Sequence, residues 1–495
     1  MQIEKRWIIQ PPITPEADAA LGQVKSPLLR QILFNRGFSN YEEARNFLNA
    51  VPNTDSDPFQ LTGMSTAVDR ICLALKSHER IAIYGDYDVD GVTATALLMQ
   101  ALKSLGADAE GYIPNRFDEG YGLNREALET LKSKGFTLVI TVDCGIRSPD
   151  EAAYAHELGL DLIISDHHHP AEGDLPLALA VIDPKQKGDL YPDKDLAGVG
   201  IAYKIAEAIS IRQGTSINLD PLLDLVALGT VADLAPLVGE NRALVRRGLR
   251  QMQAAPRQGL SALAGVAEMK LASVSAGNIG FMLGPRLNAS GRLDSALASL
   301  ELLTTTDFMR AGQLAQQLQI QNRDRQSLTR TIQEKAEEMA MADDPQGYLL
   351  FAADESFSSG IVGLAASRLT EMHYRPAVVA FKGKEETRGS CRSIPEFHIT
   401  DALDQCKDLM VRHGGHAAAA GFTVKNENLA ELMARLKEIA REKLANEDLR
   451  PTLTAEAEVP LKMMRPEVAK LLELLEPSGY GNPEAVFASK GVRVR

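Results

Sequence analysis

Carboxylate and imidazole side chains recur where short apolar runs end, and this pattern can build a metal site. The groups are Asp86, Asp88 and Asp90 after residues 81–85, Asp143 after residues 136–142, and Asp166, His167 and His168 after residues 160–165. Each run is short and apolar, which is typical of a buried strand. In an open parallel sheet, all strands deliver their carboxyl ends to one edge, where ligands bind. The sequence therefore predicts that these groups converge in space.

Carboxylates crowded in this way require a cation. Two negative charges held about 4 Å apart, away from bulk water, repel each other by several kcal/mol. Oxygen-rich ligation with imidazole, and without aligned thiolates, favours Mn²⁺ or Mg²⁺ over structural zinc. The ligands exceed the needs of one ion, so we expect two ions that share a bridging aspartate. Such a pair suits the attack of water on a phosphoryl centre.

These residues also allow other interpretations. The pattern Asp-x-Asp-x-Asp-Gly also opens calcium loops, but such a loop ends with Glu at its twelfth position, where this chain has Leu97. Asp233 ends a predicted helix and is usually explained as a capping or ion-paired aspartate. Paired histidines are often core or surface residues. The position of His167 and His168 after a strand favours a metal role.

The elements that position these acids divide the chain into five predicted parts. Strands alternate with amphipathic helices from about residue 80 to 185, which implies right-handed crossovers and a parallel sheet in an α/β fold. A second α/β unit lacks a comparable acidic cluster. The parts are an N-terminal helical extension (1–75), a catalytic α/β domain (76–296), a connecting helix (297–341), a second α/β domain (342–448) and the start of a C-terminal β domain (449–495).

Composition is typical of a globular cytoplasmic protein. No apolar run approaches the roughly 18 residues that span a bilayer, and the first residues lack the apolar core of a signal peptide. The four cysteines show no Cys-x-x-Cys spacing. We therefore expect no membrane partner.

The net charge of −13 argues mildly against a nucleic-acid partner, because such partners usually meet basic surfaces. Arginines nevertheless recur at helical spacing in two stretches, which either support DNA binding or form solvated helix faces. They are Arg242, Arg246, Arg247 and Arg250 in the first stretch, and Arg323, Arg325 and Arg330 in the second.

Several motifs together resemble the DHH phosphoesterase superfamily. Four of them match it in order and spacing: residues 85–91, 142–145, 166–168 and 229–233. Further matches lie at residues 113–117, 120–123, 284–292, 360–368, 392–394 and 414–416, so the resemblance covers nearly the whole chain. Ordered agreement of this kind is more specific than any single motif.

The resemblance implies a role for each residue of the site, with two divalent ions, Mn²⁺ or Mg²⁺, as cofactors. The first ion would be held by Asp88 and Asp143, and the second by Asp90, Asp143, His167 and Asp233. Asp143 would be the bridge. His168 would bind or polarise the scissile phosphate, and Asp86 would support the ligands from behind.

The resemblance also identifies the second α/β unit as a DHHA1 domain, which grips the nucleotide at the cleaved end. The implied substrate-binding residues are Arg116, Arg286, Asn288, Arg292, Arg392, Ser393, Gly414, Gly415 and His416. Backbone amides of a Gly-rich turn suit a phosphate nest, although chain geometry alone can require such glycines. Guanidinium groups suit phosphate, although buried ion pairs use them too.

The implied activity is that of a single-stranded-DNA-specific exonuclease that works from the 5′ end, releases nucleoside monophosphates and serves DNA repair and recombination. The implied partners are single-stranded DNA, a single-strand-binding protein and a helicase, and we expect a monomer. The C-terminal segment resembles the start of an oligonucleotide-binding (OB) barrel that stops at Arg495. Two other classes stay open. One is a relative that cleaves short substrates, such as an oligoribonuclease or a 3′-phosphoadenosine 5′-phosphate phosphatase; the other is a non-catalytic DNA-binding scaffold.

Overall fold

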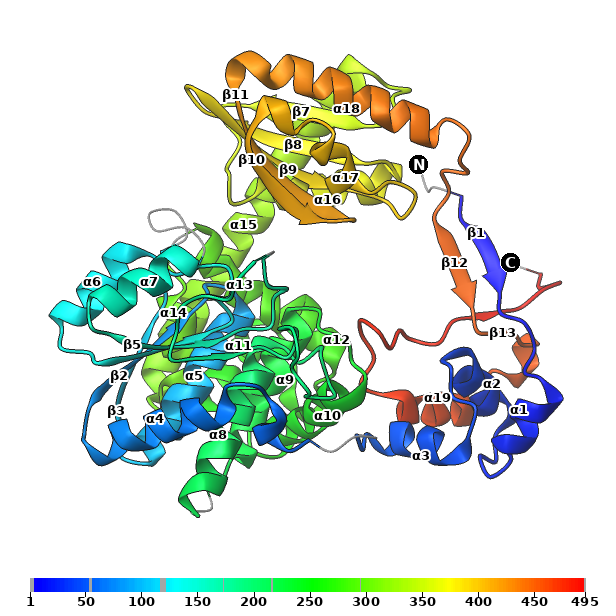
Figure 1. Cartoon of the computed structure of the whole chain (residues 1–495). Coiled ribbons are helices and arrows are strands. Elements are labelled where there is room, and N and C mark those ends of the chain that lie inside the picture. Colours follow the sequence, from blue (N-terminus) through cyan, green and yellow to red (C-terminus); the bar gives the residue numbers. More distant parts are fainter. Residues whose placement is uncertain are drawn as a thin grey trace. The chain divides into compact units, whose positions relative to one another are not determined.

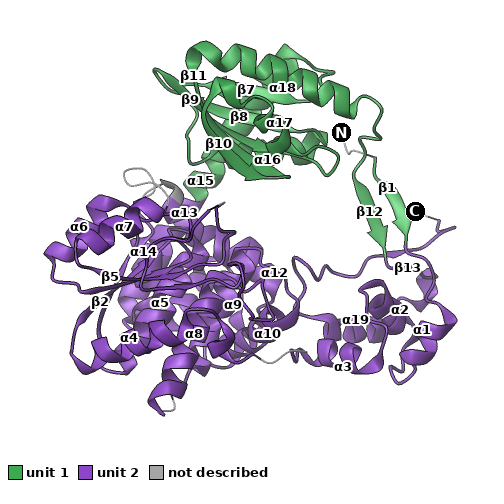
Figure 2. Cartoon of the chain, viewed as in Figure 1, with its two compact units in different colours: residues 1–9, 323–455 green, residues 10–322, 456–495 purple. Residues whose placement is uncertain are grey.

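The computed structural model describes residues 4–52, 56–115, 122–171, 173–214, 217–293 and 295–493 (Figure 1). Contacts group the chain into two compact units (Figure 2). Unit 1 comprises residues 1–9 and 323–455, and unit 2 comprises residues 10–322 and 456–495. The boundaries of the five predicted parts do not coincide with those of the two units, so the five boundaries stay predictions.

Unit 2 contains the predicted parallel sheet, with five strands in the order β3-β2-β4-β5-β6. The strands are β2 (Arg80–Gly85), β3 (Asp108–Tyr112), β4 (Leu138–Val142), β5 (Asp161–Ser165) and β6 (Ala180–Ile182). All neighbouring pairs run parallel. Gly85 lies opposite Val142, so β2 and β4 end level. The strand order reverses between these two strands, and this is the point where ligands bind in open α/β sheets.

Helices cover the sheet and enlarge its core. They are α4 (Met64–Lys76), α5 (Val89–Ser104), α6 (Arg125–Ser133), α7 (Pro149–Glu157), α8 (Gly198–Gln213), α9 (Leu223–Ala232), α10 (Gly239–Ala254), α11 (Gln258–Val266), α12 (Ala276–Asn278), the π-helix η4 (Ile279–Leu283), α13 (Gly284–Leu293) and α14 (Leu297–Thr304). Helices α5 and α9 are buried nearly all round, which is typical of helices inside a core. They pack against each other and against α8.

The stretch predicted as one connecting helix contains two helices, α14 and the long α15 (Phe308–Asp343). Asp307 separates them, because its side-chain oxygen accepts hydrogen bonds from the amides of Met309 (2.8 Å) and Arg310 (3.1 Å). An aspartate in this position caps a helix N-terminus and so begins a new helix.

The N-terminal helices pack against the C-terminal segment within unit 2. Helix α1 (Pro15–Ala20) is followed by Leu21, which shares an apolar cluster with helices α2 (Pro27–Asn35), α3 (Tyr41–Asn49) and α19 (Pro466–Leu472) and with Leu475. Arg242 of α10 joins both segments, because its buried guanidinium donates to the carbonyls of Phe47 (3.0 Å), Leu475 (2.9 Å) and Pro477 (3.0 Å). Arg242 therefore belongs neither to a solvated helix face nor to a DNA-facing surface, which corrects both interpretations for this arginine, whereas Arg247 and Arg250 are exposed.

Unit 1 contains a mixed five-stranded sheet in the order β10-β11-β9-β8-β7. The strands are β7 (Leu350–Asp354), β8 (Ala377–Lys382), β9 (Glu386–Arg392), β10 (Met410–His416) and β11 (Ala419–Lys425), with helices α16 (Val362–His373), α17 (Ile399–Asp404) and α18 (Leu429–Leu444). Only β7 and β8 pair in parallel within this sheet. The second α/β domain of the prediction is confirmed as an α/β sheet.

Two short parallel ribbons lie outside the sheets. Strand β1 (Arg6–Ile9) pairs with β12 (Thr452–Ala455), and β13 (Ala457–Glu458) pairs with β14 (Phe487–Ala488). These pairs do not close into a barrel among the described residues. The OB-like domain thus stays a prediction.

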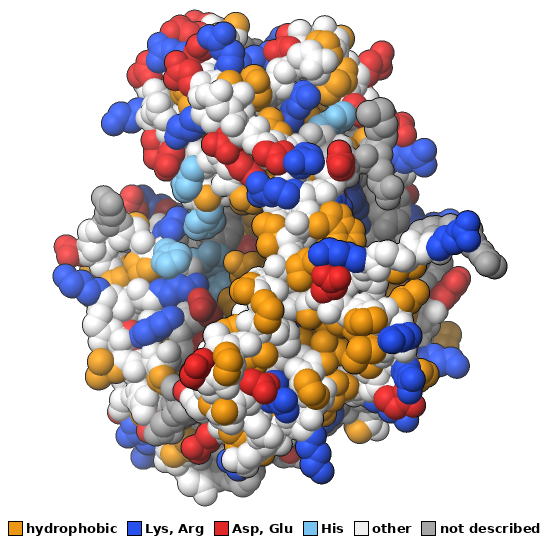
Figure 3. Space-filling model, turned by 90° about the vertical axis from the view of Figure 1, so that its right-hand side faces the viewer, with side chains coloured by type: hydrophobic (Ala, Val, Ile, Leu, Met, Phe, Trp, Pro, Cys, Tyr) orange, Lys and Arg blue, Asp and Glu red, His pale blue; other side chains and the backbone are white. Residues whose placement is uncertain are grey.

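The surface carries both signs of charge. Figure 3 shows acidic and basic side chains intermixed on one face, with apolar side chains gathered in the lower half of that view. None of the helices in the described part of the chain is long and apolar enough to cross a membrane.

Candidate metal centre

The turn between β2 and α5 holds the first three acids together. Asp88 caps α5, because its Oδ1 accepts the amides of Asp90 (2.9 Å) and Gly91 (3.1 Å). A Cβ on Gly91 would lie 2.5 Å from the backbone nitrogen of Asp86, so only glycine lets the helix begin this close to the strand. Asn288 steadies the same turn by accepting the amide of Val89 at 3.1 Å.

The N-terminus of α8 orients Asp90. The amides of Gly198 (2.7 Å) and Val199 (2.9 Å) donate to the two carboxylate oxygens of Asp90. A helix N-terminus carries partial positive charge, which favours a carboxylate in this place. A Cβ on Gly198 would lie 2.7 Å from the Cβ of Asp143, so glycine is required for α8 to approach. The sequence prediction missed this contribution, because backbone amides leave no side-chain signature.

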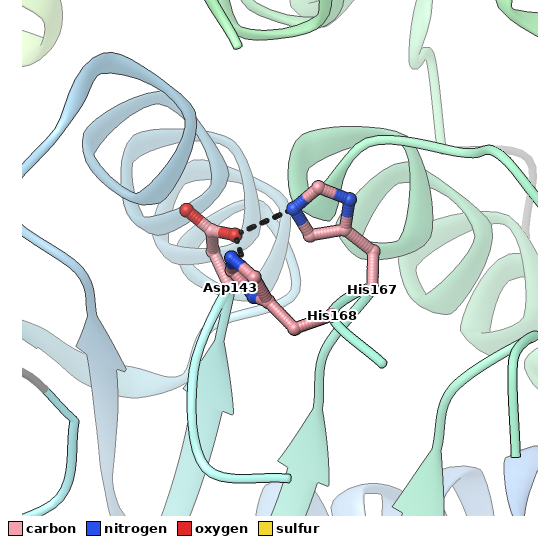
Figure 4. Close-up of side chains that lie close together, drawn as sticks. All are labelled: Asp143, His167 and His168. Atoms are coloured by element: carbon pink, nitrogen blue, oxygen red, sulfur yellow. Dashed lines mark ion pairs between the residues drawn. The ribbon is translucent and has the colours of Figure 1, made fainter. Parts of the chain in front are cut away.

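Asp143 follows β4 at the centre of the site. Its φ of +63° lies in the left-handed region, which non-glycine residues seldom adopt outside functional sites. Its Oδ1 lies 3.0 Å from Nε2 of His167 and 3.9 Å from Nδ1 of His168 (Figure 4). The buried atoms Asp143 Oδ1 and His167 Nε2 have no hydrogen-bond partner among the described residues. A lone pair on each of these two atoms is therefore available to a cation.

The predicted ligands form three overlapping groups, in each of which the potential ligand atoms lie within 4.8 Å of one another. The groups are Asp86, Asp88 and Asp143; Asp90, His167 and Asp233; and Asp143, His167 and His168. Asp143 and His167 each belong to two of them. Asp143 and His167 thus link the three groups, which could together hold two cations, and Asp86 lies among the potential ligands rather than behind them.

Burial and mutual repulsion make the carboxylates basic. Burial, followed by the charge of Asp88, raises the pKa of Asp90 to about 7. Burial, followed by the charge of Asp90, raises the pKa of Asp233 to about 8 and that of Asp143 well above its usual value. Such groups release their protons when a cation binds. The acids are thus assembled at an electrostatic cost that a divalent ion offsets.

The two histidines differ in charge. Burial, followed by the charge of His168, lowers the pKa of His167 to about 3, so its imidazole is neutral and can act as a ligand. Burial opposes the charge of His168, but its hydrogen bond to Asp166 (2.7 Å), together with the negative charges of Asp166, Asp233 and Asp88, outweighs burial and raises its pKa to about 9. A protonated, partly exposed His168 suits an anionic phosphate.

Asp166 fixes the loop that carries both histidines. Its Oδ1 accepts the amides of His167 (2.7 Å) and His168 (3.1 Å), and its Oδ2 accepts the amide of Ile146 (3.0 Å). The first aspartate of the motif therefore positions the histidines.

Two residues after β6 belong to the same edge and were missed by the sequence prediction. Lys185 donates from Nζ to the carbonyl of His167 at 2.6 Å, and its amide donates to Asp183 at 2.7 Å. Asp183 is fully buried, and burial raises its pKa to about 7. The apolar run that precedes Asp183 was a usable signal, because it marks a further strand end.

The donor set fits divalent cations. It combines carboxylate oxygens with one neutral imidazole, and the buried thiol of Cys144 donates a hydrogen bond to the carbonyl of Tyr84. A cavity of 170 Å³ opens beside it, lined by Tyr87, Asp88, Val89, Asp90, Ala232, Asp233, Asn288 and Gly291. If two divalent ions were bound by these residues, they would supply activation of water and stabilisation of negative charge on phosphoryl oxygens.

The predicted substrate residues of unit 2 divide into three cases. Asn288 lines the cavity. Arg286 donates instead to Gln319 (2.7 Å) and to the carbonyl of Met282 (2.6 Å) and does not line the cavity. Arg116 and the side chain of Arg292 lie outside the described part of the chain.

The predicted substrate residues of unit 1 gather at one end of its sheet. The register places Arg392 opposite Ala419, and Ala419 opposite His416. Ser393 donates to the carbonyl of Phe397 at 2.6 Å. Gly414 and Gly415 lie within β10 and not in a turn, which corrects the predicted Gly-rich turn. A Cβ on Gly415 would lie 2.5 Å from the Cα of Ala420, so the close approach of β11 requires this glycine.

Comparison with known proteins agrees with this geometry. The family models described as "DHH family, N-terminal domain" and "DHHA1 domain" match residues 80–230 and 346–442. The single-stranded-DNA-specific exonuclease RecJ of Dickeya dadantii is 36% identical over 495 residues, which cover 96% of this chain and 85% of that protein. The chain belongs to the RecJ family.

Other members of the family extend the comparison. RecJ of Bacillus subtilis is 39% identical over 482 residues, and the match spans 97% of this chain but only 61% of that longer protein. The crystal structure of RecJ from Thermus thermophilus in complex with Mn²⁺ superimposes with a TM-score of 0.84 at 32% identity and covers 98% of this chain and 69% of that one. A Mg²⁺ complex of the same relative gives a TM-score of 0.78.

Proposed function

We propose that this chain is a metal-dependent exonuclease specific for single-stranded DNA. The observation that carries the proposal is the convergence of carboxylates and one neutral imidazole at the switch point of the parallel sheet, in three groups linked by Asp143 and His167. Membership of the RecJ family supports the substrate, and the relative's Mn²⁺ and Mg²⁺ complexes support the cofactors. Two divalent ions would be held by Asp88 with Asp143, and by Asp90, Asp143, His167 and Asp233.

The chain's own residues divide the work. His168, protonated and partly exposed, would face the scissile phosphate. Asp166, Lys185 and the amides of α8 hold the ligands in place. Arg392, Ser393, Gly414, Gly415 and His416 would grip the cleaved nucleotide.

The finer parts of the proposal rest on the family resemblance. They are 5′ polarity, release of nucleoside monophosphates, a role in DNA repair and recombination, action as a cytoplasmic monomer, and supply of substrate by a single-strand-binding protein and a helicase. The four cysteines are free thiols, which suits a reducing compartment.

The test is digestion of 5′-labelled single- and double-stranded oligonucleotides with Mn²⁺. We expect labelled mononucleotide from single strands only, a loss of more than about 100-fold in Asp143→Ala, and wild-type rates in the control Asp150→Ala on the exposed face of α7. Inactivity on long strands with cleavage of very short ones would instead assign the chain to the short-substrate relatives. Inactivity on every substrate would leave the scaffold class.

A further inference from the structure

An apolar groove of 460 Å³ lies in unit 2 beside the metal centre. Its walls include Val231, Leu234, Leu237, Phe281, Tyr480 and Pro483. The groove and the metal cavity share the C-terminal end of α9, because Asp233 lines the cavity and the next residue, Leu234, lines the groove. The groove therefore begins one residue away from the metal cavity, within reach of nucleotides next to a phosphate bound there.

Leu234 is held in an unfavourable conformation that exposes it. Helix α9 ends with the amide of Leu234 bonded to the carbonyl of Val231 (3.3 Å) and the amide of Ala235 bonded to the carbonyl of Thr230 (3.1 Å). This type of helix end usually places glycine in the left-handed position. Here a leucine with φ of +60° occupies it, and 68% of its surface is exposed. Strain combined with an exposed apolar side chain points to function rather than stability.

Two aromatic rings complete the groove, each on its own constrained segment. Phe281 is 86% exposed and lies on the π-helix Ile279–Leu283, a rare element that is frequent at functional sites. Tyr480 is 64% exposed, and its carbonyl accepts the amide of Leu237 at 2.7 Å. A Cβ on Gly479 would lie 2.8 Å from the Leu237 side chain, so the loop sits tightly on the groove floor. The loop thus presents the tyrosine outward.

The charge of the groove indicates which part of a strand it accepts. Its lining includes Glu476 and Glu484 and, among the described residues, no lysine or arginine. The Glu476 carboxylate accepts the amide (2.8 Å) and hydroxyl (3.1 Å) of Ser478. Such a lining repels phosphate but offers flat apolar surface to uncharged rings. Every nucleobase can stack on aromatic side chains, whatever the sequence.

We propose that this groove, which we call the Phe281–Tyr480 groove, binds unpaired bases of the strand next to the cleaved nucleotide. Bases point into the groove while the phosphates stay outside it. A duplex cannot use the groove, because its bases are stacked and paired within the helix. The inference rests on the proposed function. It would explain part of the proposed enzyme's preference for single-stranded over double-stranded DNA.

The test compares KM and kcat of wild type, Phe281→Ala and Tyr480→Ala on single strands of increasing length with Mn²⁺. We expect KM for long strands to rise about 5- to 150-fold in each variant, the range of one lost stacking contact. The shortest substrates should keep their wild-type kcat. Tyr480→Phe should retain stacking, and Phe308→Ala is the control, because Phe308 is 73% exposed and lies outside the groove.

A substrate experiment makes the test independent of folding. Abasic positions next to the 5′ nucleotide should raise the KM of wild type to the level of the variants, while the variants should not respond to them. Unchanged KM in both variants, or an equal loss of kcat/KM on substrates of every length, would overturn the inference. If neither KM nor kcat changed on any substrate, the groove would not bind the strand, and a protein partner would be its remaining candidate ligand. If wild type itself cleaves no strand, the proposed function fails, and that failure is seen without any groove variant.

Discussion

Binding of Mn²⁺ should depend steeply on pH, because the carboxylates of the metal centre are basic without a cation. The pKa of Asp90 is raised from 3.8 to about 7, mainly by burial, and that of Asp233 is raised to about 8. At about 1.4 kcal/mol for each tenfold change, the raised pKa of Asp90 alone corresponds to about 4 kcal/mol. The two carboxylates interact, so their contributions do not simply add.

The sign of the effect follows from proton linkage. Without metal, the folded protein binds more protons than the unfolded chain between about pH 4 and pH 8. The contribution of these groups to stability is therefore present at low pH and is lost as pH rises through their folded pKa values. A bound cation replaces those protons, so its stabilising effect grows over the same range. For Asp90 alone, apparent Mn²⁺ affinity should be about tenfold higher at pH 8 than at pH 6.

Titration calorimetry of wild type and Asp90→Asn at pH 6 and pH 8 measures this directly. Repeating it in buffers of different ionisation enthalpy counts the protons released. We expect proton release and a strong pH dependence in wild type, and weaker binding with less pH dependence in Asp90→Asn. Equal affinity at both pH values without proton release would show that the carboxylates are already ionised, and the reasoning from burial would be wrong.

Three further substitutions test individual contacts. Gly198→Ala should destabilise the protein by about 1–3 kcal/mol in urea unfolding and weaken Mn²⁺ binding, because its Cβ would collide with the aspartate after β4, whereas Gly265→Ala on α11 has open space and should be neutral or stabilising. Arg242→Met should cost more than about 2 kcal/mol, since it leaves several buried carbonyls without donors, while Arg250→Met on the exposed side of α10 should stay within about 0.5 kcal/mol. Lys185→Met should weaken Mn²⁺ binding about tenfold, because the carbonyl of His167 loses the hydrogen bond that holds its loop. An unchanged Mn²⁺ affinity in titration calorimetry would show that this lysine does not position the ligands.

The convergence of the candidate metal ligands was predictable because side-chain type and topology are both visible in the sequence. Alternating aspartates after an apolar run indicate a strand that turns into a helix, and alternation of strands with helices implies parallel strands whose ends meet. Asp233 was ambiguous from its own surroundings, because a helix end explains an aspartate equally well. The structure brings it to His167, with 3.7 Å between Asp233 Oδ2 and His167 Nε2.

The supporting contacts were not predictable, for two physical reasons. The α8 amides act through the backbone, and Gly198 matters only because of what approaches it in space. Gly414 and Gly415 were predicted as a turn because adjacent glycines favour turns, but both lie within β10, where Gly415 allows β11 to pack closely. The same glycine signal thus has two physical causes that local sequence does not separate.

Net charge does not describe the candidate metal centre, for a related reason. The value of −13 counts every aspartate of the metal centre as a free negative charge. Several of these carboxylates are buried and basic, and two divalent cations held by them would bring four positive charges. His168, with its pKa of about 9, and Lys185 add positive charge at the same edge. With two cations bound, the candidate centre would be close to neutral toward an incoming phosphate, so attraction of a DNA substrate would depend on the metal more than on the sum of side-chain charges.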